Sequence, residues 1–332
     1  MSTVLVVTNK DDPHADEVIP RLDGLGATVF RLNTEDLPGK ISITHTVAGC
    51  ESSKITTSTR QCDLKNIFGV WYRRPLEPRI SEAVRDEEYR GFAIAECSAA
   101  LDGVLLCTRP RVWVNHPEAN RIAGNKLFQL AIAKSIGLRV PASVITNDSK
   151  EAIDFVRGHQ RAVIKPLTSP LINRGAHAEY VYATVVDEEA LRQREYAIRH
   201  APVIFQEFVT KLRDIRVTVI GREVYAVAIE SQEDAASLVD FRRGFVENLR
   251  HIVWTLPSKT EELCRRLTYC LKLNFSTIDF AEHLDGSLYF LEINPNGQFG
   301  WLTHKTDLPL YDKIAALLNG SLPSLTDSGG IR

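Results

Sequence analysis

Hydrophobic and polar positions follow several different periods along the chain, and the first stretches predict a parallel sheet. Residues 3–8, TVLVVT, form an apolar run typical of a buried strand, and residues 14–26 suit a helix that ends at Gly24 or Gly26. ATVFRL at 27–32 predicts the next strand. A strand, a helix and a strand in this order predict a βαβ unit of Rossmann-like type and an α/β (α+β) fold class. The stretch has no GxGxxG motif, so a dinucleotide site has little support.

Mixed strands and helices continue through the first third of the chain. Two threonine-rich stretches of alternating polarity, 41–47 and 54–60, predict a hairpin around Gly49. IFGVWY at 67–72 predicts another strand, which RRP follows, and a long helix is expected over 82–101.

Two further units are expected after a boundary near residues 110–117. A helix over 119–136 closes at Gly137, and a small α/β unit covers about 140–200. The rest is richest in strands and in polar residues at strand positions. The predicted organisation is a domain over 1–112, a central subdomain over 113–200 and a C-terminal subdomain over 201–325.

Composition and charge make several classes of protein improbable. The 332 residues support two or three domains, and 44% hydrophobic with 25% charged residues is typical of soluble globular proteins. A formal net charge of −2 provides no overall field for nucleic acid or an anionic membrane. The start MSTVLVVTNK lacks the basic region of a signal peptide, and no apolar run approaches the length of a membrane span. The six cysteines form no CxxC pair, which suits reduced thiols in a cytoplasmic protein.

Two strands in the last unit place oxygen ligands opposite each other. FSTIDFA carries Asp279, and YFLEIN ends with Glu292 and Asn294 on one face and with Leu291 and Ile293 on the other. The intervening Asp-Gly pair predicts a two-residue hairpin turn, which would pair Leu284 with Ser287. Counting outward from that turn sets Asp279 opposite Glu292 and Thr277 opposite Asn294.

Two carboxylates placed in this way either share a proton or share a cation. Cross-strand neighbours lie about 4.5–5.5 Å apart at Cβ. With an amide oxygen beside them they suit Mg²⁺, which takes one or two protein carboxylates and leaves other positions to phosphate and water. The alternative is a solvated acidic face. The stop at Pro295 and the Asn-Gly-Gln loop that follows favour the metal site.

Cationic residues suited to phosphate occur at three other points. RAVIKPL ends an apolar strand with Lys165, and GNKLFQL places Lys126 near a helix start, where the helix dipole favours an anion. In DIRVTVIG, Asp214 and Arg216 share one strand face, and Arg216 suits the stabilisation of a transferring phosphoryl group. The alternatives are lysines that reach solvent and an ordinary Asp–Arg surface pair.

Three segments are expected to enclose a nucleotide. QEFV, at 206–209, predicts a strand running into a linker whose backbone suits an adenine edge. TSPLINRGAHAEYVY at 168–182 predicts either a mobile lid over phosphates or an ordinary hairpin loop. In DFRRG the adjacent Arg242 and Arg243 face opposite ways if they lie on a strand, and we expect Arg242 to point into the groove.

The order Lys126, Lys165, QEFV, DIR, IDF and LEIN resembles the ATP-grasp fold, in which two α/β units hold ATP between them. The resemblance covers about 113–300, behind a pre-ATP-grasp domain. It implies that Lys126 and Lys165 contact the nucleotide phosphates and that Arg216 and Arg242 stabilise the phosphoryl group. It also implies nucleotide contacts from Gln206, Glu207, Phe208, Val209, Lys211 and Asp214, and Mg²⁺ held by Asp279, Glu292 and Asn294.

WYRRP at 71–75, SQ followed by DFRRG, and NPNGQFGW resemble the microviridin-type peptide maturases, which make graspetides. This resemblance implies an ATP-dependent ligase that phosphorylates Asp or Glu side chains of a ribosomal precursor peptide. A Ser or Thr hydroxyl or a Lys amine then forms an ω-ester or ω-amide crosslink. It also implies recognition of a leader segment and a homodimer.

Other functions and roles stay open at this stage. A RimK-like ligase that adds free amino acids to a protein or a small-molecule carboxylate is the main alternative, and an ATP-binding regulatory protein on the same fold is a further one. His116, His177 and His304 are candidates for a general base. The hairpin over 216–230 offers Val224, Tyr225 and Val227 as a leader-docking edge, although simple core packing is the favoured interpretation.

Overall fold

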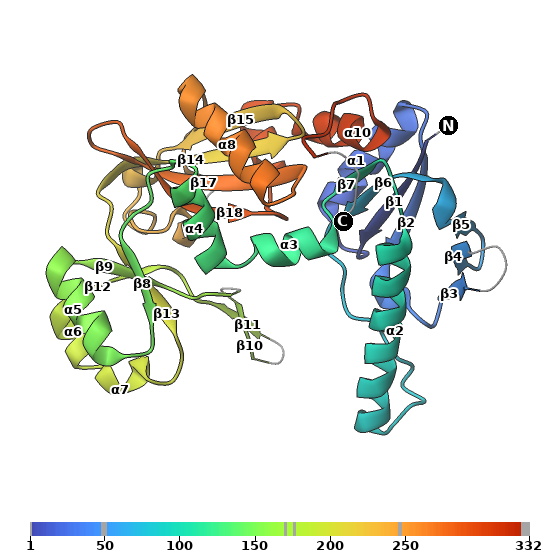
Figure 1. The fold of residues 1–332 in the computed structure, drawn as a ribbon, viewed down its shortest axis with the longest axis horizontal. Coiled ribbons are helices and arrows are strands. Elements are labelled where there is room, and N and C mark those ends of the chain that lie inside the picture. The colour runs from blue at the N-terminus through green and yellow to red at the C-terminus, as the bar shows by residue number, and fades with distance from the viewer. Residues whose placement is uncertain (1, 48–51, 169–170, 175–176, 245–247, 327–332) are drawn as a thin grey trace.

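A parallel sheet with the order β2-β1-β6-β7 forms the centre of the N-terminal domain. The computed structural model describes residues 2–47, 52–168, 171–174, 177–244 and 248–326 (Figure 1). Asp12 accepts a hydrogen bond from the His14 N–H and caps the helix between the first two strands, as the predicted βαβ unit requires. The elements are β1 (Thr3–Thr8), α1 (Pro13–Gly24), β2 (Thr28–Asn33), β6 (Ile67–Tyr72) and β7 (Val112–Val114).

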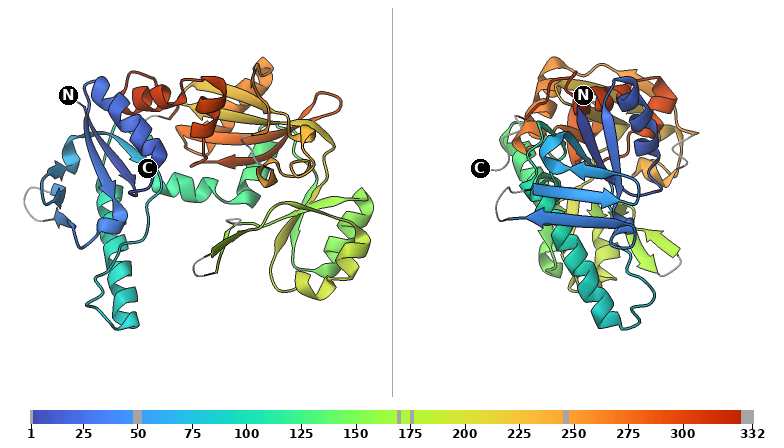
Figure 2. Two further views of the ribbon diagram at one scale, coloured as in Figure 1. Left: turned by 180° about the vertical axis from the view of Figure 1, so that it is seen from behind. Right: turned by 90° about the vertical axis from the view of Figure 1, so that its right-hand side faces the viewer.

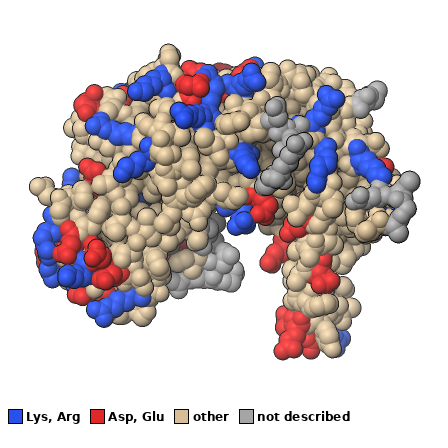
Figure 3. All heavy atoms as spheres, viewed as in Figure 1, with Lys and Arg blue, Asp and Glu red and all other residues tan. Residues whose placement is uncertain are grey.

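A small antiparallel sheet and a projecting helix complete this domain. Strands β3 (Ile41–Thr46) and β4 (Ser52–Thr57) form the predicted hairpin, and β5 (Gln61–Asp63) adds a third strand; Gly49 lies outside the described residues. Helix α2 (Glu87–Cys107) begins and ends later than the predicted 82–101, because Asp86 caps its N-terminus. Its free end extends away from the body of the protein, and acidic side chains gather there (Figures 2 and 3).

The helix predicted over 119–136 is two helices, α3 (Pro117–Ala123) and α4 (Lys126–Ser135). The break follows Gly124, because the Asn125 side chain accepts a hydrogen bond from the Phe128 N–H and starts a new helix. Lys126 is therefore the first residue of α4, which confirms its expected place near a helix start, and the prediction of a single long helix over 119–136 is wrong. Helix α3 bridges the N-terminal domain and the rest of the protein (Figure 1).

The central subdomain is an antiparallel sheet with the order β12-β9-β13-β8 and three helices packed on it. Because β13 pairs with both β8 and β9, this sheet extends past residue 200, where the sequence suggested a division. A separate hairpin stands beside it. The elements are β8 (Ser143–Thr146), α5 (Ser149–His159), β9 (Ala162–Lys165), β10 (Leu171–Arg174), β11 (His177–Tyr180), β12 (Thr184–Val186), α6 (Glu188–Arg192), α7 (Glu195–Ile198) and β13 (Val203–Glu207).

The C-terminal subdomain is a five-stranded antiparallel sheet with the order β16-β15-β14-β17-β18. Helix α8 packs on one face together with α4. The elements are β14 (Lys211–Ile220), β15 (Glu223–Ile229), β16 (His251–Trp254), α8 (Ser258–Cys270), β17 (Phe275–His283), β18 (Leu288–Asn294), α9 (Gly300–Thr306) and α10 (Leu310–Asn319). Among the described residues, none of the helices combines the length and the apolar composition needed to cross a membrane.

Strand β15 is covered by β16 over residues 226–229, and this arrangement favours core packing over a leader-docking edge for the hairpin. The strand lies between β14 and β16, and both neighbours are hydrogen-bonded to it. Val227 is buried, and Val224 and Tyr225 pack against core clusters. Core packing, the favoured interpretation of the sequence, explains these side chains.

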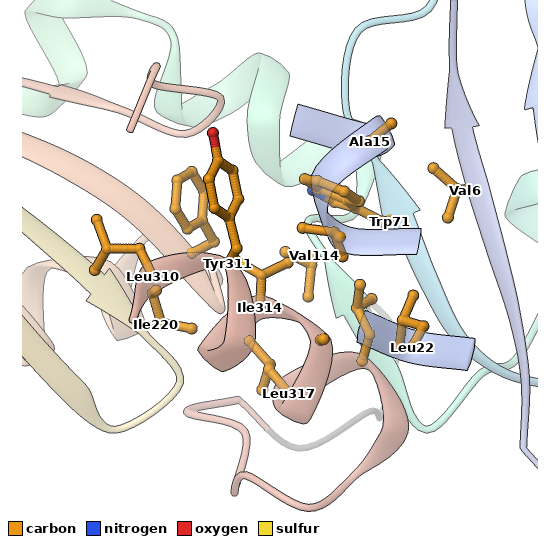
Figure 4. Close-up of a cluster of buried hydrophobic side chains, with 14 of the residues drawn as sticks. Val6, Ala15, Leu22, Trp71, Val114, Ile220, Leu310, Tyr311, Ile314 and Leu317 are labelled. Carbon is orange, nitrogen blue, oxygen red and sulfur yellow. The ribbon is translucent and has the colours of Figure 1, made fainter. Parts of the chain in front are cut away.

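Helix α10 completes the core of the N-terminal domain, although it lies at the other end of the sequence (Figure 4). Ile314 and Leu317 belong to one buried cluster with Val6, Leu22 and Trp71. The contact is close, because a Cβ atom at Gly69 of β6 would overlap the carbonyl group of Leu318. The N-terminal domain and the C-terminal subdomain are therefore joined by one continuous core.

Polar contacts hold the loop after β18 against the same domain. The buried Arg73 donates from Nη1 to the carbonyl oxygen of Asn296 at 2.6 Å. The His14 Nε2 atom accepts hydrogen bonds from the backbone N–H of Gly300 at 3.0 Å and of Phe299 at 3.4 Å. This loop directly follows Asn294, so the N-terminal domain determines its position.

Acid is expected to destabilise this junction through His14. Burial, with the nearby Arg73 charge, lowers the pKa of His14 from 6.5 to about 3. As the pH falls, His14 takes up a proton in the unfolded chain before it does so in the folded protein. The free energy of unfolding therefore decreases by about 1.4 kcal/mol for each pH unit below about 6.5 and is unaffected by His14 above that pH. The measurement is the free energy of unfolding at pH 7 and pH 5 for the wild type and His14→Gln, which keeps an acceptor without titrating. A difference between the two proteins that does not change with pH would contradict the assignment.

Candidate active site

A cavity of about 800 Å³ lies between the central sheet and the C-terminal sheet and gathers most of the predicted site. Its walls come from α4, from the end of β9, from β14, from β17 and β18, and from a 3₁₀ turn over Phe241–Arg243. The predicted residues that line it are Lys126, Lys165, Asp214, Arg242, Asp279, Glu292 and Asn294.

The predicted cross-strand pairs are confirmed, but by a different hairpin geometry. Asp279 pairs with Glu292 and Thr277 with Asn294. The turn has three residues rather than two, because the His283 N–H donates to the Ser287 carbonyl, and Leu284 is not paired with Ser287. A one-residue bulge between the turn and the site then shifts the register back. The two deviations cancel at Asp279 and Glu292.

The bulge also changes the direction of Leu291, which alternation had placed on the face away from the ligands. Phe280 pairs with Phe290, so Leu291 is the extra residue on β18. Leu291 and Glu292 both line the cavity, while Phe290 and Ile293 are fully buried in the core. Two consecutive residues therefore face the cavity, and Leu291 adds an apolar surface beside the charged one.

Burial and opposite charges give the two carboxylates different acidities. Burial, with the charge of Glu292, raises the pKa of Asp279 against the opposing Arg216. Burial also acts to raise the pKa of Glu292, but Arg242, Lys126 and Lys165 together outweigh it and lower that pKa. Arg216 Nη1 donates to both Asp279 oxygens, at 2.7 and 2.8 Å. Asp214 and Arg216 do not form the surface pair considered as the alternative for them.

The two lysines face the same carboxylate from opposite subdomains. Lys126 Nζ lies 3.6 Å from Glu292 Oε2 and donates to the carbonyl of Pro166 at 3.0 Å. Lys165 Nζ donates to Gln206 Oε1 at 2.8 Å, and burial lowers its pKa from 10.5 to about 8. Neither lysine is directed simply to solvent, and both line the cavity as expected of phosphate ligands.

Arg242 points into the groove and Arg243 does not. Arg242 donates from Nε and Nη2 to the two oxygens of Asp240, both at 2.8 Å, and its Nη1 lies 3.6 Å from Glu292 Oε1. Arg243 donates to Thr184 Oγ1. The residues lie on a 3₁₀ turn rather than a strand. Asp240, which fixes Arg242, was missed, although an acidic residue two positions before the arginine was visible in DFRRG.

Five predicted nucleotide contacts are not among the described residues that line the cavity: Gln206, Glu207, Phe208, Val209 and Lys211. Gln206 is buried and orients Lys165, and the Glu207 backbone N–H donates to Ala142. Lys211 forms a buried ion pair with Asp214, at 2.7 Å. Gln206 and Lys211 therefore hold the cavity residues Lys165 and Asp214 in place without lining the cavity themselves. Contacts of residues 207–209 with a nucleotide stay a prediction.

A second cavity of about 550 Å³ adjoins the first and shares Phe241, Arg242 and Asn294 with it. Arg216, predicted as a phosphoryl ligand, lines this second space together with the loop over 295–298. Arg74, from the end of the WYRRP motif, and Lys305, from α9, complete the set of cations. The sequence used WYRRP only as a family feature, so the role of Arg74 as a wall residue was missed.

The loop at the junction has no room for a side chain at Gly297. An added Cβ would overlap Thr277 Oγ1 and lie 2.8 Å from Thr277 Cβ and Cγ2. Gly297→Ala is therefore expected to lower the free energy of unfolding by about 1–3 kcal/mol and to reduce turnover, because the loop carries the carbonyl that Arg216 binds. Chemical denaturation measures the first effect. Gly39→Ala, where an added Cβ meets nothing within 4 Å, is the control, and an unchanged Gly297→Ala protein would contradict the argument.

The donor set fits Mg²⁺. Within the part of the chain that the structure describes, no group of three or more His, Cys, Asp or Glu side chains forms an all-protein metal cage. Two carboxylates and the amide of Asn294 leave positions for phosphate oxygens, which is the coordination that Mg²⁺ favours. The buried like charges of Asp279 and Glu292, with the raised pKa of Asp279, are a reason for a cation to bind there.

No general base emerges from the predicted histidines. His116 caps α3, and burial lowers its pKa. His304 lies on α9 beside Tyr311, and neither histidine is among the described residues that line the two cavities. The side chain of His177 lies outside the part of the structure that is described.

Known proteins share both the domain order and the fold. Residues 3–121 match the MvdD pre-ATP grasp domain, and residues 123–318 match the RimK-like ATP-grasp domain. A RiPP-associated ATP-grasp ligase from Chryseobacterium gregarium, solved with ADP and a leader and core peptide, is 29% identical with a TM-score of 0.92 over 99% of both chains. The macrocyclase MdnB from Microcystis aeruginosa MRC is 26% identical with a TM-score of 0.78, covering 96% of this chain and 99% of that one.

Two other similarities are more limited. The macrocyclase MdnC from Microcystis aeruginosa MRC, bound with its precursor peptide MdnA, has a TM-score of 0.84 over 96% of this chain and 99% of that one, at 24% identity, which shows the fold alone. An uncharacterized protein of Mycoplasma genitalium is 27% identical over 126 residues, and the match spans 37% of this chain and 42% of that protein. The two family models together nevertheless cover nearly all of residues 3–318, so the resemblance seen in the sequence is confirmed. The chain belongs to the RimK-like ATP-grasp family and carries a pre-ATP-grasp domain of the MvdD type.

Proposed function

We propose that this protein is an ATP- and Mg²⁺-dependent ligase that crosslinks side chains within a ribosomal precursor peptide. The main evidence is a cavity lined by two opposed carboxylates, two lysines and Arg242, which adjoins a second cavity lined by Arg216. The 29% identical ligase from Chryseobacterium gregarium, whose structure is a complex with ADP and a leader and core peptide, supports a peptide as the substrate.

The reaction proceeds in two balanced steps. A carboxylate oxygen of a precursor Asp or Glu attacks the γ-phosphorus of ATP, the bond to the β,γ-bridging oxygen breaks, and ADP leaves with that electron pair. A Ser or Thr hydroxyl or a Lys amine of the same peptide then attacks the acyl carbon, loses its proton and expels phosphate. The peptide loses one water for each ester or amide formed.

The residues divide these tasks between the two cavities. Lys126, from α4, and Lys165, from the end of β9, would bind the nucleotide phosphates from the two sides of the first cavity. Asp279, Glu292 and Asn294 would hold Mg²⁺, which shields the phosphate charges when bound. Arg242, which lines both spaces, and Arg216, which lines the second, would stabilise the charge on the phosphoryl group as it moves from ATP to the carboxylate.

The hairpin β10–β11 is proposed as a lid over this site. Thr168 on one side of the hairpin and Val181 and Ala183 on the other line the first cavity. Closing the hairpin over the phosphates would exclude water from the acyl phosphate, which otherwise hydrolyses.

We also propose a homodimer that works in the cytoplasm without nucleic acid. Tyr89 and Phe92 on the projecting part of α2 are 70% and 66% exposed, which suits a covered interface. Lys and Arg side chains on the face seen in Figure 3 are scattered among acidic ones on the central subdomain, and no basic stripe runs over it. Light scattering of the wild type and of Phe92→Glu tests the dimer: a monomeric wild type would contradict it.

Mass spectrometry of a candidate precursor tests the function. The peptide encoded beside the gene is incubated with the protein, ATP and Mg²⁺, and ADP is measured in parallel. Loss of one water per bond, with one ADP formed for each, is the expected result. A gain of amino-acid residue masses when free amino acids are added would instead indicate the RimK-like ligase, and unchanged peptide with no ADP would contradict the proposal.

A further inference from the structure

The second cavity is a cationic pocket, defined here by Arg74, Arg216, Arg242 and Lys305 with walls from Phe241, Trp301 and the 295–298 loop. Among its described lining residues there is no carboxylate. The first cavity differs, since four acidic residues there balance its cations: Asp214, Asp240, Asp279 and Glu292. An anion is therefore favoured in the cationic pocket, on the opposite side of Arg242 from the two phosphate-facing lysines.

Arg216 and Arg242 already have carboxylate partners. Arg216 donates to both oxygens of Asp279, and Arg242 donates to both oxygens of Asp240. These pairs fix the guanidinium groups in place but neutralise much of their charge. Arg216 and Arg242 are therefore suited to a phosphoryl group, because its charge increases during the transfer. They are less suited to bind the substrate carboxylate before the reaction begins.

Arg74 differs from both, because it forms no ion pair with any described residue. With the Gln298 amide oriented so that its oxygen faces Arg74, that oxygen accepts from Nη1 at 2.9 Å and from Nη2 at 3.0 Å. A neutral amide therefore orients the guanidinium and leaves its full charge available. Gln298 belongs to the loop whose backbone carbonyl also accepts from Arg216.

The N-terminal domain holds Arg74 rigidly at this wall. Its carbonyl accepts a hydrogen bond from Asn9 Nδ2 at 2.6 Å. The preceding Arg73 donates from its backbone to Val7 and from its side chain to Asn296. Arg74 thus lies just past the carboxyl end of β6, the edge of a parallel sheet where ligands commonly bind.

We propose that Arg74 binds the precursor carboxylate that is about to be phosphorylated and presents it to the γ-phosphate. This rests on the proposed function and adds a substrate-binding role for the N-terminal domain. Arg74 forms a bidentate pair with the acidic side chain, Trp301 and Phe241 contact its aliphatic part, and Arg216 and Arg242 receive the phosphoryl group. The pocket therefore selects peptides by a carboxylate on a short side chain.

Steady-state kinetics with the precursor that the wild type dehydrates tests this role. Arg74→Ala is expected to raise the KM for the precursor by about tenfold to a hundredfold, the value of a charge-assisted hydrogen-bonded pair, and to leave the KM for ATP unchanged. Arg74→Lys should recover part of the loss, because it keeps the charge but not the fork geometry. Arg79→Ala, an exposed arginine of the same segment, is the matched control and should behave as the wild type.

Two measurements separate binding from structural damage. The thermal midpoint of Arg74→Ala should equal that of the wild type, and a peptide containing only the leader should bind both proteins equally. An unchanged precursor KM in Arg74→Ala would overturn the proposal, as would a rise in the KM for ATP of similar size. A wild type that dehydrates no peptide would instead contradict the proposed function, so the two failures are distinguishable.

Discussion

Glu292→Gln is expected to lower peptide dehydration and ADP formation by on the order of a thousandfold, with a protein that still folds. Glu292 lies opposite Asp279 on the neighbouring strand and within 3.6 Å of both Lys126 and Arg242. The substitution keeps the size of the side chain and removes the charge that these cations and Mg²⁺ share. Initial rates at several Mg²⁺ concentrations measure the effect, and the Mg²⁺ needed for half-maximal rate should rise.

The matched control is Asp285→Asn, which removes a carboxylate from the same hairpin. Asp285 is exposed at the turn and binds Ser287 rather than a cavity residue. It should keep wild-type turnover and Mg²⁺ dependence. Wild-type turnover in Glu292→Gln would show that the metal assignment is wrong.

Arg216→Met is expected to reduce both turnover and stability. The guanidinium pairs with Asp279 in a buried position, so its removal leaves a carboxylate without its partner and next to Glu292. Loss of such a partner lowers the free energy of unfolding by about 3–5 kcal/mol. Loss of charge stabilisation for the phosphoryl group lowers kcat by about a hundredfold to a thousandfold. Chemical denaturation and initial-rate kinetics measure the two effects separately.

Arg213→Met distinguishes the loss of stability from the loss of catalysis. Arg213 lies on the same strand as Arg216 and also forms ion pairs with partly buried carboxylates. It pairs with Glu230 at 2.7 Å and with Glu282 at 3.1 Å, outside the lining of both cavities. This variant should lose stability and keep kcat. If Arg216→Met retained wild-type kcat under conditions where it is folded, its assignment to the phosphoryl group would be refuted.

Alternation and turn chemistry were sufficient to predict that Asp279 lies opposite Glu292, but not how the strands reach that register. The Asp-Gly turn signal predicted a two-residue loop, and the structure has three residues and a compensating bulge. A bulge has no periodic signal, so Leu291 was assigned to the wrong face while Glu292 was assigned correctly. Strand ends set by Pro and polar residues were easier to predict than an irregularity in the middle of a strand.

Contacts between distant segments were the part that the sequence did not predict. Lys165 was expected at a phosphate, yet its partner Gln206 was assigned to the nucleotide. Arg74 was visible only as part of a motif, because its place in the wall depends on the N-terminal domain meeting the loop after β18. Helical periodicity likewise extended across Gly124, because a cap by Asn125 interrupts the helix without changing the apolar pattern.

The shared core between α10 and the N-terminal sheet also constrains how the chain is made. A ribosome releases the strands β1 and β6 long before it synthesises residues 310–319, which cover Val6, Leu22 and Trp71. At about 5–20 residues per second, the first domain emerges from the ribosome with an uncovered apolar face for on the order of ten seconds or more. Chaperones that bind nascent chains therefore have a defined target and a defined interval, and a pause in translation upstream of α10 would lengthen the exposure.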